Sequence, residues 1–245
     1  LLGSTIGALG VGVVIESGDD RFQAGDAVAG GLGAQTHATV STVFLEKVDT
    51  SRFGPATQLG AMGLTTGLTA YVGMKFVGRV TESDTVVVSG AAGAVGTFAG
   101  QIARLLGAKR VIGIAGGPEK GHYLVDELGY DASVDYRADN VDARLKELAP
   151  DGIDVFFDNV GGDILDAVLA RINRKARIVI CGAISQYNNT TPVQAPKNYM
   201  SLLVNRARME GMVVFDYADR YPQAIAEMAG YLKDGRMKSK EDVVD

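Results

Sequence analysis

The sequence predicts an α/β protein in which a doubly wound parallel sheet follows a smaller, all-β unit. From residue 84 onward, short β-branched segments alternate with segments of helical periodicity, which is typical of a parallel sheet covered by helices. Residues 1–50 instead carry short β-type runs separated by turn signals. With 245 residues, 47% of them hydrophobic, the chain can bury a core in each part, and disorder is disfavoured.

The expected elements follow from these periodicities. Short strands are predicted at 11–15 and 27–29, and a helical pattern covers 54–77. The alternating part predicts strands at 85–89, 110–115, 133–136, 153–157, 177–181 and 209–215, and helices over 95–106, 118–128, 140–148, 163–172, 198–206 and 219–234.

Composition excludes several classes of function. The net charge of −5 comes with no basic stripe, which argues against a nucleic-acid partner. No apolar run approaches 18 residues, so no membrane span is expected. A single cysteine, Cys181, allows neither an internal disulfide nor a cysteine-based zinc site, and it fits a cytoplasmic location. His37 and His122 have no ligand partner at metal spacing, so no metal site is expected.

A glycine-rich turn joins the first strand of the alternating part to its helix. The run Gly90-Ala91-Ala92-Gly93-Ala94-Val95-Gly96 keeps side chains small where backbone amides would meet a pyrophosphate at a helix N-terminus. Ala91 stands where the first glycine of the strict dinucleotide motif would be, and a tight turn without a ligand is the alternative. The position of the turn, first in a series of βα units, favours a dinucleotide.

The end of the second strand of this part indicates which dinucleotide. An NAD-specific site places an acidic residue there to hold the ribose 2′-hydroxyl. Here Gly116 and Gly117 occupy that place, and Lys120 follows at the start of the next helix. A cation without an acid suits a 2′-phosphate and therefore NADPH. The alternative, a solvated surface lysine, is equally compatible with the spacing.

Several segments, taken in order, resemble one known family. They are the glycine turn, Glu119-Lys120, Asp158-Asn159-Val160-Gly161-Gly162 and Cys181-Gly182-Ala183-Ile184-Ser185-Gln186-Tyr187-Asn188. Together they resemble the prostaglandin reductase (leukotriene B4 12-hydroxydehydrogenase) branch of the zinc-independent medium-chain dehydrogenases/reductases. Residues 198–217 resemble bacterial NADPH-dependent curcumin reductases more closely still.

The resemblance implies two domains, with the active site in the cleft between them. Residues 1–60 would form part of a GroES-like substrate and catalytic domain, and residues 61–235 a Rossmann domain that binds NADPH. Residues 236–245 would begin the return to the GroES-like domain, so the sequence is expected to be truncated at both ends. A homodimer is compatible with this family.

The resemblance also implies a reaction and a set of site residues. Members of this branch reduce the carbon–carbon double bond of small α,β-unsaturated ketones and aldehydes with NADPH and without zinc. Carried over by position, Gly93, Ala94, Val95 and Gly96 would hold the pyrophosphate, and Lys120 and Tyr136 the 2′-phosphate. Asn159, Cys181, Gly182, Ala183, Ile184, Ser185, Gln186 and Tyr187 would line the nicotinamide side, and Met212, Val213 and Val214 would also face the cofactor.

Tyr187 is the candidate catalytic residue. Its hydroxyl could hydrogen-bond the nicotinamide ribose or donate to the oxygen of a developing enolate without ionising. The alternative is a buried aromatic side chain whose hydroxyl is satisfied. Two other functions remain open at this point, an NADPH quinone reductase of the same superfamily and an NADPH-binding protein without catalytic activity. Asp158 is expected to pack near the carboxyl edge of the sheet, a position that does not require a catalytic role.

Overall fold

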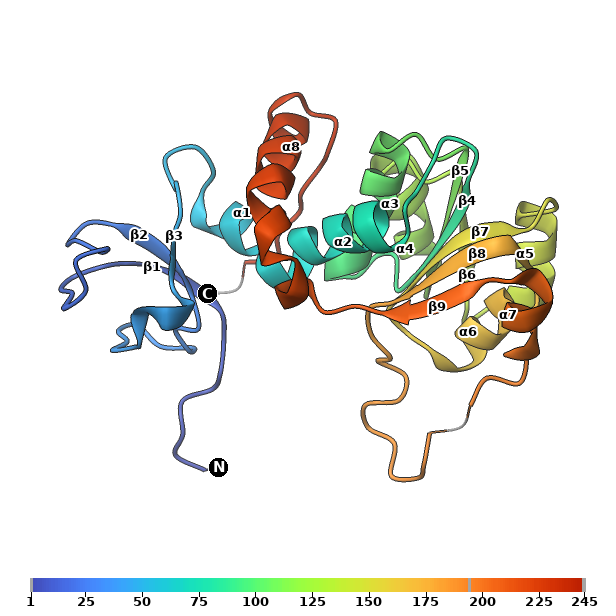
Figure 1. Ribbon diagram of the computed structural model, residues 1–245, viewed down its shortest axis with the longest axis horizontal. Helices are drawn as coiled ribbons and strands as arrows, with labels where there is room; N and C mark the ends of the chain where they lie inside the picture. The colour runs from blue at the N-terminus through green and yellow to red at the C-terminus, as the bar shows by residue number, and fades with distance from the viewer. Residues whose placement is uncertain (1, 194, 244–245) are drawn as a thin grey trace. The chain divides into compact units, whose positions relative to one another are not determined.

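The computed structural model describes residues 2–193 and 195–243, which form two compact units (Figure 1). One unit contains the residues up to 64 together with those from 239 onward, and the other is Thr65–Lys238. Every residue expected to bind the cofactor lies in the larger unit. None of the helices in the described residues combines the length and apolar character that a membrane crossing requires.

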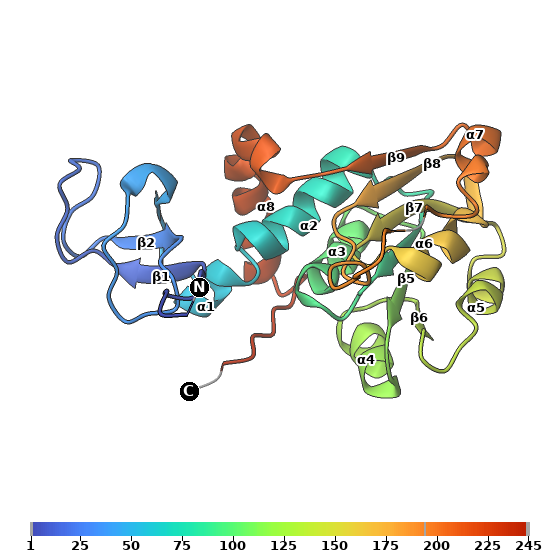
Figure 2. The ribbon, with the colours of Figure 1, turned by 90° about the horizontal axis from the view of Figure 1, so that it is seen from below.

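A six-stranded, fully parallel sheet forms the centre of the larger unit, which confirms the predicted fold class (Figures 1 and 2). The chain begins in the middle of the sheet, builds outward to one edge, and then crosses back to build the other half. Ligands of such sheets bind beyond the carboxyl ends of the strands, at the point where the order reverses. The strand order is β6 (Ala132–Asp135), β5 (Arg110–Ala115), β4 (Thr85–Ser89), β7 (Ile153–Asp158), β8 (Ile172–Ile180) and β9 (Arg208–Gly211).

Helices cover both faces of this sheet. Successive side chains of a strand point to opposite faces, so Phe156 and Phe157 of β7 enter different cores. Phe156 belongs to a buried cluster with Leu145 and Val168, which lie on two of the helices, whereas Phe157 packs beside Gly73. The helices of this unit are α2 (Thr69–Val72), α3 (Ala94–Leu105), α4 (Pro118–His122), α5 (Val141–Leu148), α6 (Gly162–Leu169), α7 (Met200–Asn205) and α8 (Tyr221–Lys233).

Three expected elements end differently from their predictions. The helical pattern over 54–77 is interrupted at 60–63, between α1 (Pro55–Leu59) and a π-helical segment that precedes α2. Gly60 ends α1 with ψ near −101°, a conformation incompatible with continuing the helix. The helix expected over 163–172 stops at Leu169, because Ile172 already pairs with β7 as the first residue of β8.

The last predicted strand, 209–215, is also shorter than expected. Strand β9 ends at Gly211, and a 3₁₀ helix, Val214–Arg220, follows it. Apolar side chains at 212–215 suit either conformation, and periodicity over four residues cannot distinguish them.

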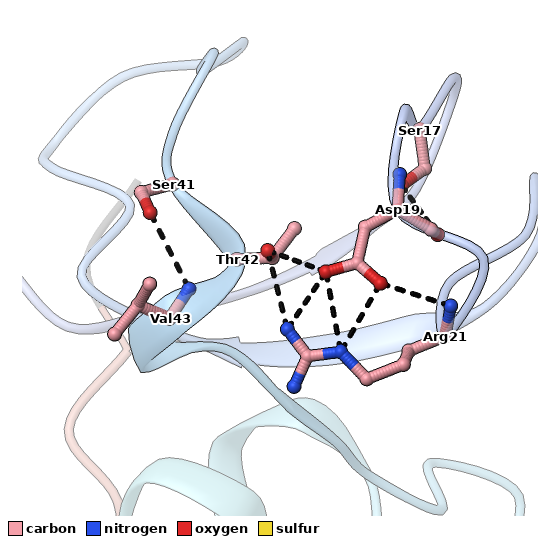
Figure 3. A network of polar contacts seen from close by, with 6 residues as sticks. All are labelled: Ser17, Asp19, Arg21, Ser41, Thr42 and Val43. Atoms are coloured by element: carbon pink, nitrogen blue, oxygen red, sulfur yellow. Dashed lines mark hydrogen bonds and ion pairs between the residues drawn. The ribbon is translucent and has the colours of Figure 1, made fainter.

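The smaller unit contains a three-stranded antiparallel sheet, β1 (Gly10–Val13), β2 (Ala27–Gly30) and β3 (Glu46–Lys47), and the helix α1. A polar network ties its loops together (Figure 3). Asp19 accepts hydrogen bonds from the Arg21 guanidinium at 2.7 Å and from the Thr42 hydroxyl at 2.7 Å. These bonds hold the pKa of Asp19 well below its usual range.

Candidate functional site

The glycine turn after β4 presents backbone amides at a helix N-terminus. All five residues of β4 are buried, and Gly90 then turns the chain with φ of +57°, which glycine adopts without strain. Gly93 is the N-cap of the 12-residue helix α3, and no side chain caps it. Gly93 and Ala94 are exposed, so the first amides of the helix are open to an anion.

Gly96 is needed because α3 packs directly on this turn. A Cβ at Gly96 would lie 2.6 Å from the Cα of Ala91 and closer still to the carbonyl oxygen of Gly90. The hydroxyl of the buried Tyr130 donates to the Gly96 carbonyl at 2.8 Å. Burial raises the pKa of Tyr130, which keeps the hydroxyl protonated as the donor.

The connections after β5 and β6 meet above Gly116. A Cβ at Gly116 would lie 2.9 Å from Cε1 of Tyr136 and 2.8 Å from Nε of Arg137, so both side chains lie over this backbone. One carboxylate oxygen of Asp135 accepts the amides of Gly117 at 2.9 Å and Arg137 at 3.0 Å, which ties the two connections together.

These contacts bring a second cation to the expected 2′-phosphate end. Arg137 lies beside Tyr136, with its guanidinium carbon 5.8 Å from the ring centroid, and both side chains are exposed. Lys120 is exposed on α4, one connection away. Sequence reasoning missed Arg137, although a basic residue directly after Tyr136 was a usable signal, because arginine binds phosphate well.

A cavity of about 340 Å³ lies between α4 and β6, close to this end of the sheet. Its lining contains three carboxylates, those of Asp126, Asp135 and Asp139, and contains neither Lys120 nor Tyr136. Carboxylates repel a phosphate, so we assign none of the phosphates of the dinucleotide to this cavity.

The loops after β7 and β8 are joined side by side at the carboxyl edge of the sheet. The backbone amides of Cys181 and Gly182 donate to the carbonyl of Asp158 at 2.9 and 3.1 Å, and the Ile184 amide donates to the Asn159 carbonyl at 3.1 Å. The Ser185 hydroxyl adds a bond of 2.6 Å to the Val160 carbonyl. Two segments expected on the nicotinamide side are therefore held together.

Asn159 is also tied to the first strand of the sheet. Its side-chain amide donates to the carbonyl of Ser89 at 2.7 Å, and its backbone amide donates to the Ser89 hydroxyl at 2.8 Å. Since β4 and β7 are the strands on either side of the point where the order reverses, Asn159 lies where ligands of this fold class bind.

Tyr187 folds back over its own loop. Its hydroxyl oxygen accepts the backbone amide of Ala183 at 3.1 Å, and this arrangement leaves the hydroxyl proton free to be donated. The side chain is 67% exposed, so Tyr187 is not a core aromatic residue. In the same loop, burial and then the charge of Asp158 raise the pKa of the Cys181 thiol to about 11, which keeps it protonated and unreactive near neutral pH.

Three residues after β9, Met212, Val213 and Val214, were expected to face the cofactor, and only Val213 has an exposed side chain. Met212 and Val214 are buried, and the sulfur of Met212 lies 2.9 Å from the position that a Cβ on Gly73 would take. Val213 is 54% exposed. A ligand could therefore touch the side chain of Val213, but only the backbone of its two neighbours.

The side chains that could bind a metal ion do not cluster in the part of the chain that the structure describes. Within residues 2–193 and 195–243, no three side chains of His, Cys, Asp and Glu gather as a metal site would require. His37 contacts the Thr36 hydroxyl at 3.3 Å, and His122 lies 3.4 Å from Asp126 on the same helix. Independence of zinc remains a prediction.

The family model described as zinc-binding dehydrogenase matches residues 94–230, which begin at α3 and end within α8. The chain belongs to this family, within the medium-chain dehydrogenases/reductases. The match includes the glycine turn from Ala94 onward, the connections that meet at Gly116, and both loops of the nicotinamide side. Sequence analysis identified this family correctly.

Three curated relatives have similar sequences over almost all of this chain. YfmJ of Bacillus subtilis, whose name assigns it to the NADP-dependent oxidoreductases, is 44% identical over 97% of this chain and 71% of its own length. An NADP⁺-dependent 2-alkenal reductase of Nicotiana tabacum is 40% identical, covering 98% of this chain and 70% of the relative. An NADPH-dependent curcumin reductase of Escherichia coli is 37% identical, covering 95% and 68%.

Two solved structures extend the comparison to the fold. CurA of Vibrio vulnificus in complex with NADPH superimposes with a TM-score of 0.89 at 38% identity, covering 97% of this chain and 72% of CurA. A quinone oxidoreductase of Pseudomonas syringae gives a TM-score of 0.77 at 29% identity, covering 97% and 73%. Family members with similar folds thus carry names for different substrates.

Proposed function

We propose that this oxidoreductase binds NADPH and reduces the carbon–carbon double bond of small α,β-unsaturated ketones or aldehydes. The observation that carries the proposal is that two features suited to a dinucleotide lie at the carboxyl edge of the parallel sheet. An open helix N-terminus at Gly93 suits a pyrophosphate, and the joined loops 158–162 and 181–187 lie beyond the neighbouring strands. The relatives named for alkenal and curcumin reduction support the substrate class.

The residues present fit NADPH better than NADH. Strand β5 is followed by Gly116 and Gly117 instead of an acid, and the exposed cation Arg137 lies over Gly116. Lys120 adds a second exposed cation on α4. We therefore assign the 2′-phosphate to Lys120, Tyr136 and Arg137, and the pyrophosphate to the amides of residues 93–96.

The proposed reaction requires that the protein orient NADPH and the substrate and that it supply a hydrogen-bond donor to the substrate. When bound, NADPH would supply a hydride to the β-carbon of the substrate, and the resulting enolate would carry its negative charge on the carbonyl oxygen until a proton from a side chain or from water adds to the α-carbon. A donor directed at that oxygen stabilises the charge as it develops. The free hydroxyl proton of Tyr187 is available either to the nicotinamide ribose or to that oxygen, and Asn159 and the loop 181–187 orient the reactants.

A substrate comparison tests this function. Purified protein is mixed with NADPH and either an α,β-unsaturated ketone or a quinone, and oxidation of NADPH is followed with and without a strong chelator. We expect kcat/KM for the enone to exceed that for the quinone by roughly tenfold or more, with no effect of chelation. A preference for the quinone would favour the second candidate, a quinone reductase, which the Pseudomonas syringae structure supports. Activity lost on chelation and restored by zinc would contradict the zinc-independent assignment.

Replacing Tyr187 with phenylalanine separates a catalytic role from a positioning role. The change removes only the hydroxyl, so packing of the exposed ring should be retained. We expect a loss of about 1 kcal/mol, or roughly fivefold, mainly in KM, as for a ground-state contact. A drop of about a hundredfold in kcat would instead assign Tyr187 a direct role in stabilising the transition state.

The control for this comparison is Tyr199→Phe, because Tyr199 is exposed and lies outside the proposed site. The measurement is single-turnover oxidation of NADPH with a simple enone. An unchanged rate in Tyr187→Phe would remove Tyr187 from the site and leave Asn159 and backbone donors as the candidates.

We also propose the remaining features of the protein's organisation. Residues 61–235 form the NADPH-binding Rossmann domain, and residues 1–60 and 236–245 belong to a GroES-like domain. A homodimer is supported by two features: β9 is an edge strand, and the helix before it, α7, exposes the apolar side chains of Leu203 and Val204. Light scattering would measure the mass of the protein in solution and so test for a dimer.

The single cysteine supports a cytoplasmic location.

A further inference from the structure

Asp158, the last residue of β7, is completely buried, and its two side-chain oxygens differ in the hydrogen bonds that they accept. Its Oδ1 accepts three hydrogen bonds, from the Ser89 hydroxyl at 2.7 Å and from the amides of Val160 at 2.9 Å and Gly161 at 3.0 Å. Among residues 2–193 and 195–243, nothing hydrogen-bonds its Oδ2. A buried polar atom without a partner is unfavourable and rare, which suggests that the group is kept for a reason other than stability.

One of the three donors to Oδ1, Ser89, connects the carboxyl group of Asp158 to Asn159. Ser89 donates to Asp158 and in turn accepts the backbone amide of Asn159 at 2.8 Å, so the carboxyl oxygen fixes the orientation of the hydroxyl. The side-chain amide of Asn159 donates to the carbonyl of the same serine. Asp158 therefore acts on Asn159 through one intermediate side chain.

The other two donors shape the loop between β7 and α6. Gly161 and Gly162 follow with φ of +71° and +59°, so this turn depends on its hydrogen bonds for a defined shape. A Cβ at Gly162 would lie 3.1 Å from Oγ of Ser185, which places the turn directly against the loop 181–187. The main-chain carbonyl of Asp158 binds that same loop through Cys181 and Gly182.

We propose that Asp158 is a positioning residue for hydride transfer, which holds Asn159 and the loop 181–187 in the arrangement that the nicotinamide end of the cofactor requires. The inference rests on the proposed function, because it assumes that NADPH occupies this edge of the sheet. Burial raises the pKa of Asp158 above its usual range, because it outweighs the opposing effect of the three hydrogen bonds to Oδ1.

A buried aspartate elsewhere in the sheet provides the comparison. Asp84 is 4% exposed and precedes β4, at the opposite end from the proposed site. It accepts the amide of Thr81 at 2.7 Å and pairs with the guanidinium of Arg177. Removing either carboxylate disturbs a buried polar network, but only Asp158 is connected to Asn159 and the loop 181–187.

The experiment compares two ligands, NADPH and adenosine 2′,5′-bisphosphate, which lacks the nicotinamide half. In Asp158→Ala, we expect the dissociation constant for NADPH to rise by roughly tenfold or more, and that for the bisphosphate to stay within about twofold. Asp158→Asn should recover much of the loss, because an amide oxygen also accepts hydrogen bonds. With an enone, the alanine variant should lose more in kcat than in KM for the enone.

Two further variants keep the test decisive. Asp84→Ala should lower the melting temperature and leave the ratio of the two dissociation constants unchanged. Ser89→Ala, a smaller change that remains usable should Asp158→Ala fail to fold, should raise the NADPH constant selectively.

The inference is overturned when neither Asp158→Ala nor Ser89→Ala weakens NADPH selectively, or when the asparagine variant is as poor as the alanine variant. Wild-type protein that binds neither ligand would overturn the proposed function and this inference together. Binding of both ligands without oxidation by any enone would refute only the proposed reaction, since the two dissociation constants still measure positioning.

Discussion

Alanine at Gly96 is expected to destabilise the larger unit and to abolish tight binding of NADPH. The new methyl group would lie 2.6 Å from the Cα of Ala91, and the atoms it meets are backbone atoms that cannot rotate away. Overpacking of a buried site costs about 1–3 kcal/mol, and we expect the upper end because α3 and the glycine turn must separate. For a protein of this size, that loss corresponds to roughly 6–12 °C in melting temperature.

The same displacement moves the amides of the turn away from the pyrophosphate. An error of about 1 Å in such a site can reduce activity by roughly a hundredfold, so NADPH affinity should fall by at least about tenfold. Gly230→Ala is the matched control, because Gly230 lies inside α8 with no atom within 4 Å of the added Cβ. That variant should be as stable as the parent or slightly more so. A Gly96→Ala protein with unchanged melting temperature and NADPH affinity would contradict the close packing described here.

Alanine at Lys120 is expected to weaken NADPH while leaving NADH almost unchanged. A charge-assisted hydrogen bond between the ammonium and the 2′-phosphate exists only with NADPH, and its loss should raise the dissociation constant by roughly tenfold to a hundredfold. Titrating both cofactors by fluorescence, in one buffer of fixed ionic strength, gives the comparison. Lys146→Ala, on the exposed side of α5, controls for the loss of a surface cation.

Arg137→Ala should give a selective loss of the same kind, because this side chain lies over Gly116 beside Tyr136. Equal weakening of NADPH and NADH in Lys120→Ala would refute the assignment of Lys120. A selective loss in Arg137→Ala alone would move the 2′-phosphate contact from α4 to the connection after β6.

Much of the larger unit could be predicted because its signals are local. The strand 85–89 begins with four consecutive β-branched residues, and the structure buries all five residues of the strand. Val95, Phe98 and Ile102 recur at helical spacing, and α3 spans all three. Glycines at 90–96 and 116–117 predicted tight turns after the first two strands of this unit, and the structure places both turns at the carboxyl ends of β4 and β5; their role in binding the cofactor stays a prediction.

Other features depend on contacts between residues distant in the sequence. Asp158 looks unremarkable in the chain, and only the packing of β4 against β7 brings Ser89 to its carboxyl oxygen, 69 residues away. Met212 was expected to face the cofactor, but the structure buries its side chain beside Gly73. Sequence spacing does not reveal the direction of a side chain just after a strand ends.

The amino-acid sequence alone was sufficient for the succession of strands and helices along the chain, for the family, and for the glycine-rich turn that joins β4 to α3. These follow from hydrophobic periodicity and from backbone conformations that only glycine adopts easily, and both are local properties. The tertiary structure decided which side chains meet at the carboxyl edge of the sheet, namely Arg137 above Gly116 and Asp158 beneath Asn159. Such neighbours are set by strand order and register, and these depend on the packing of the whole sheet.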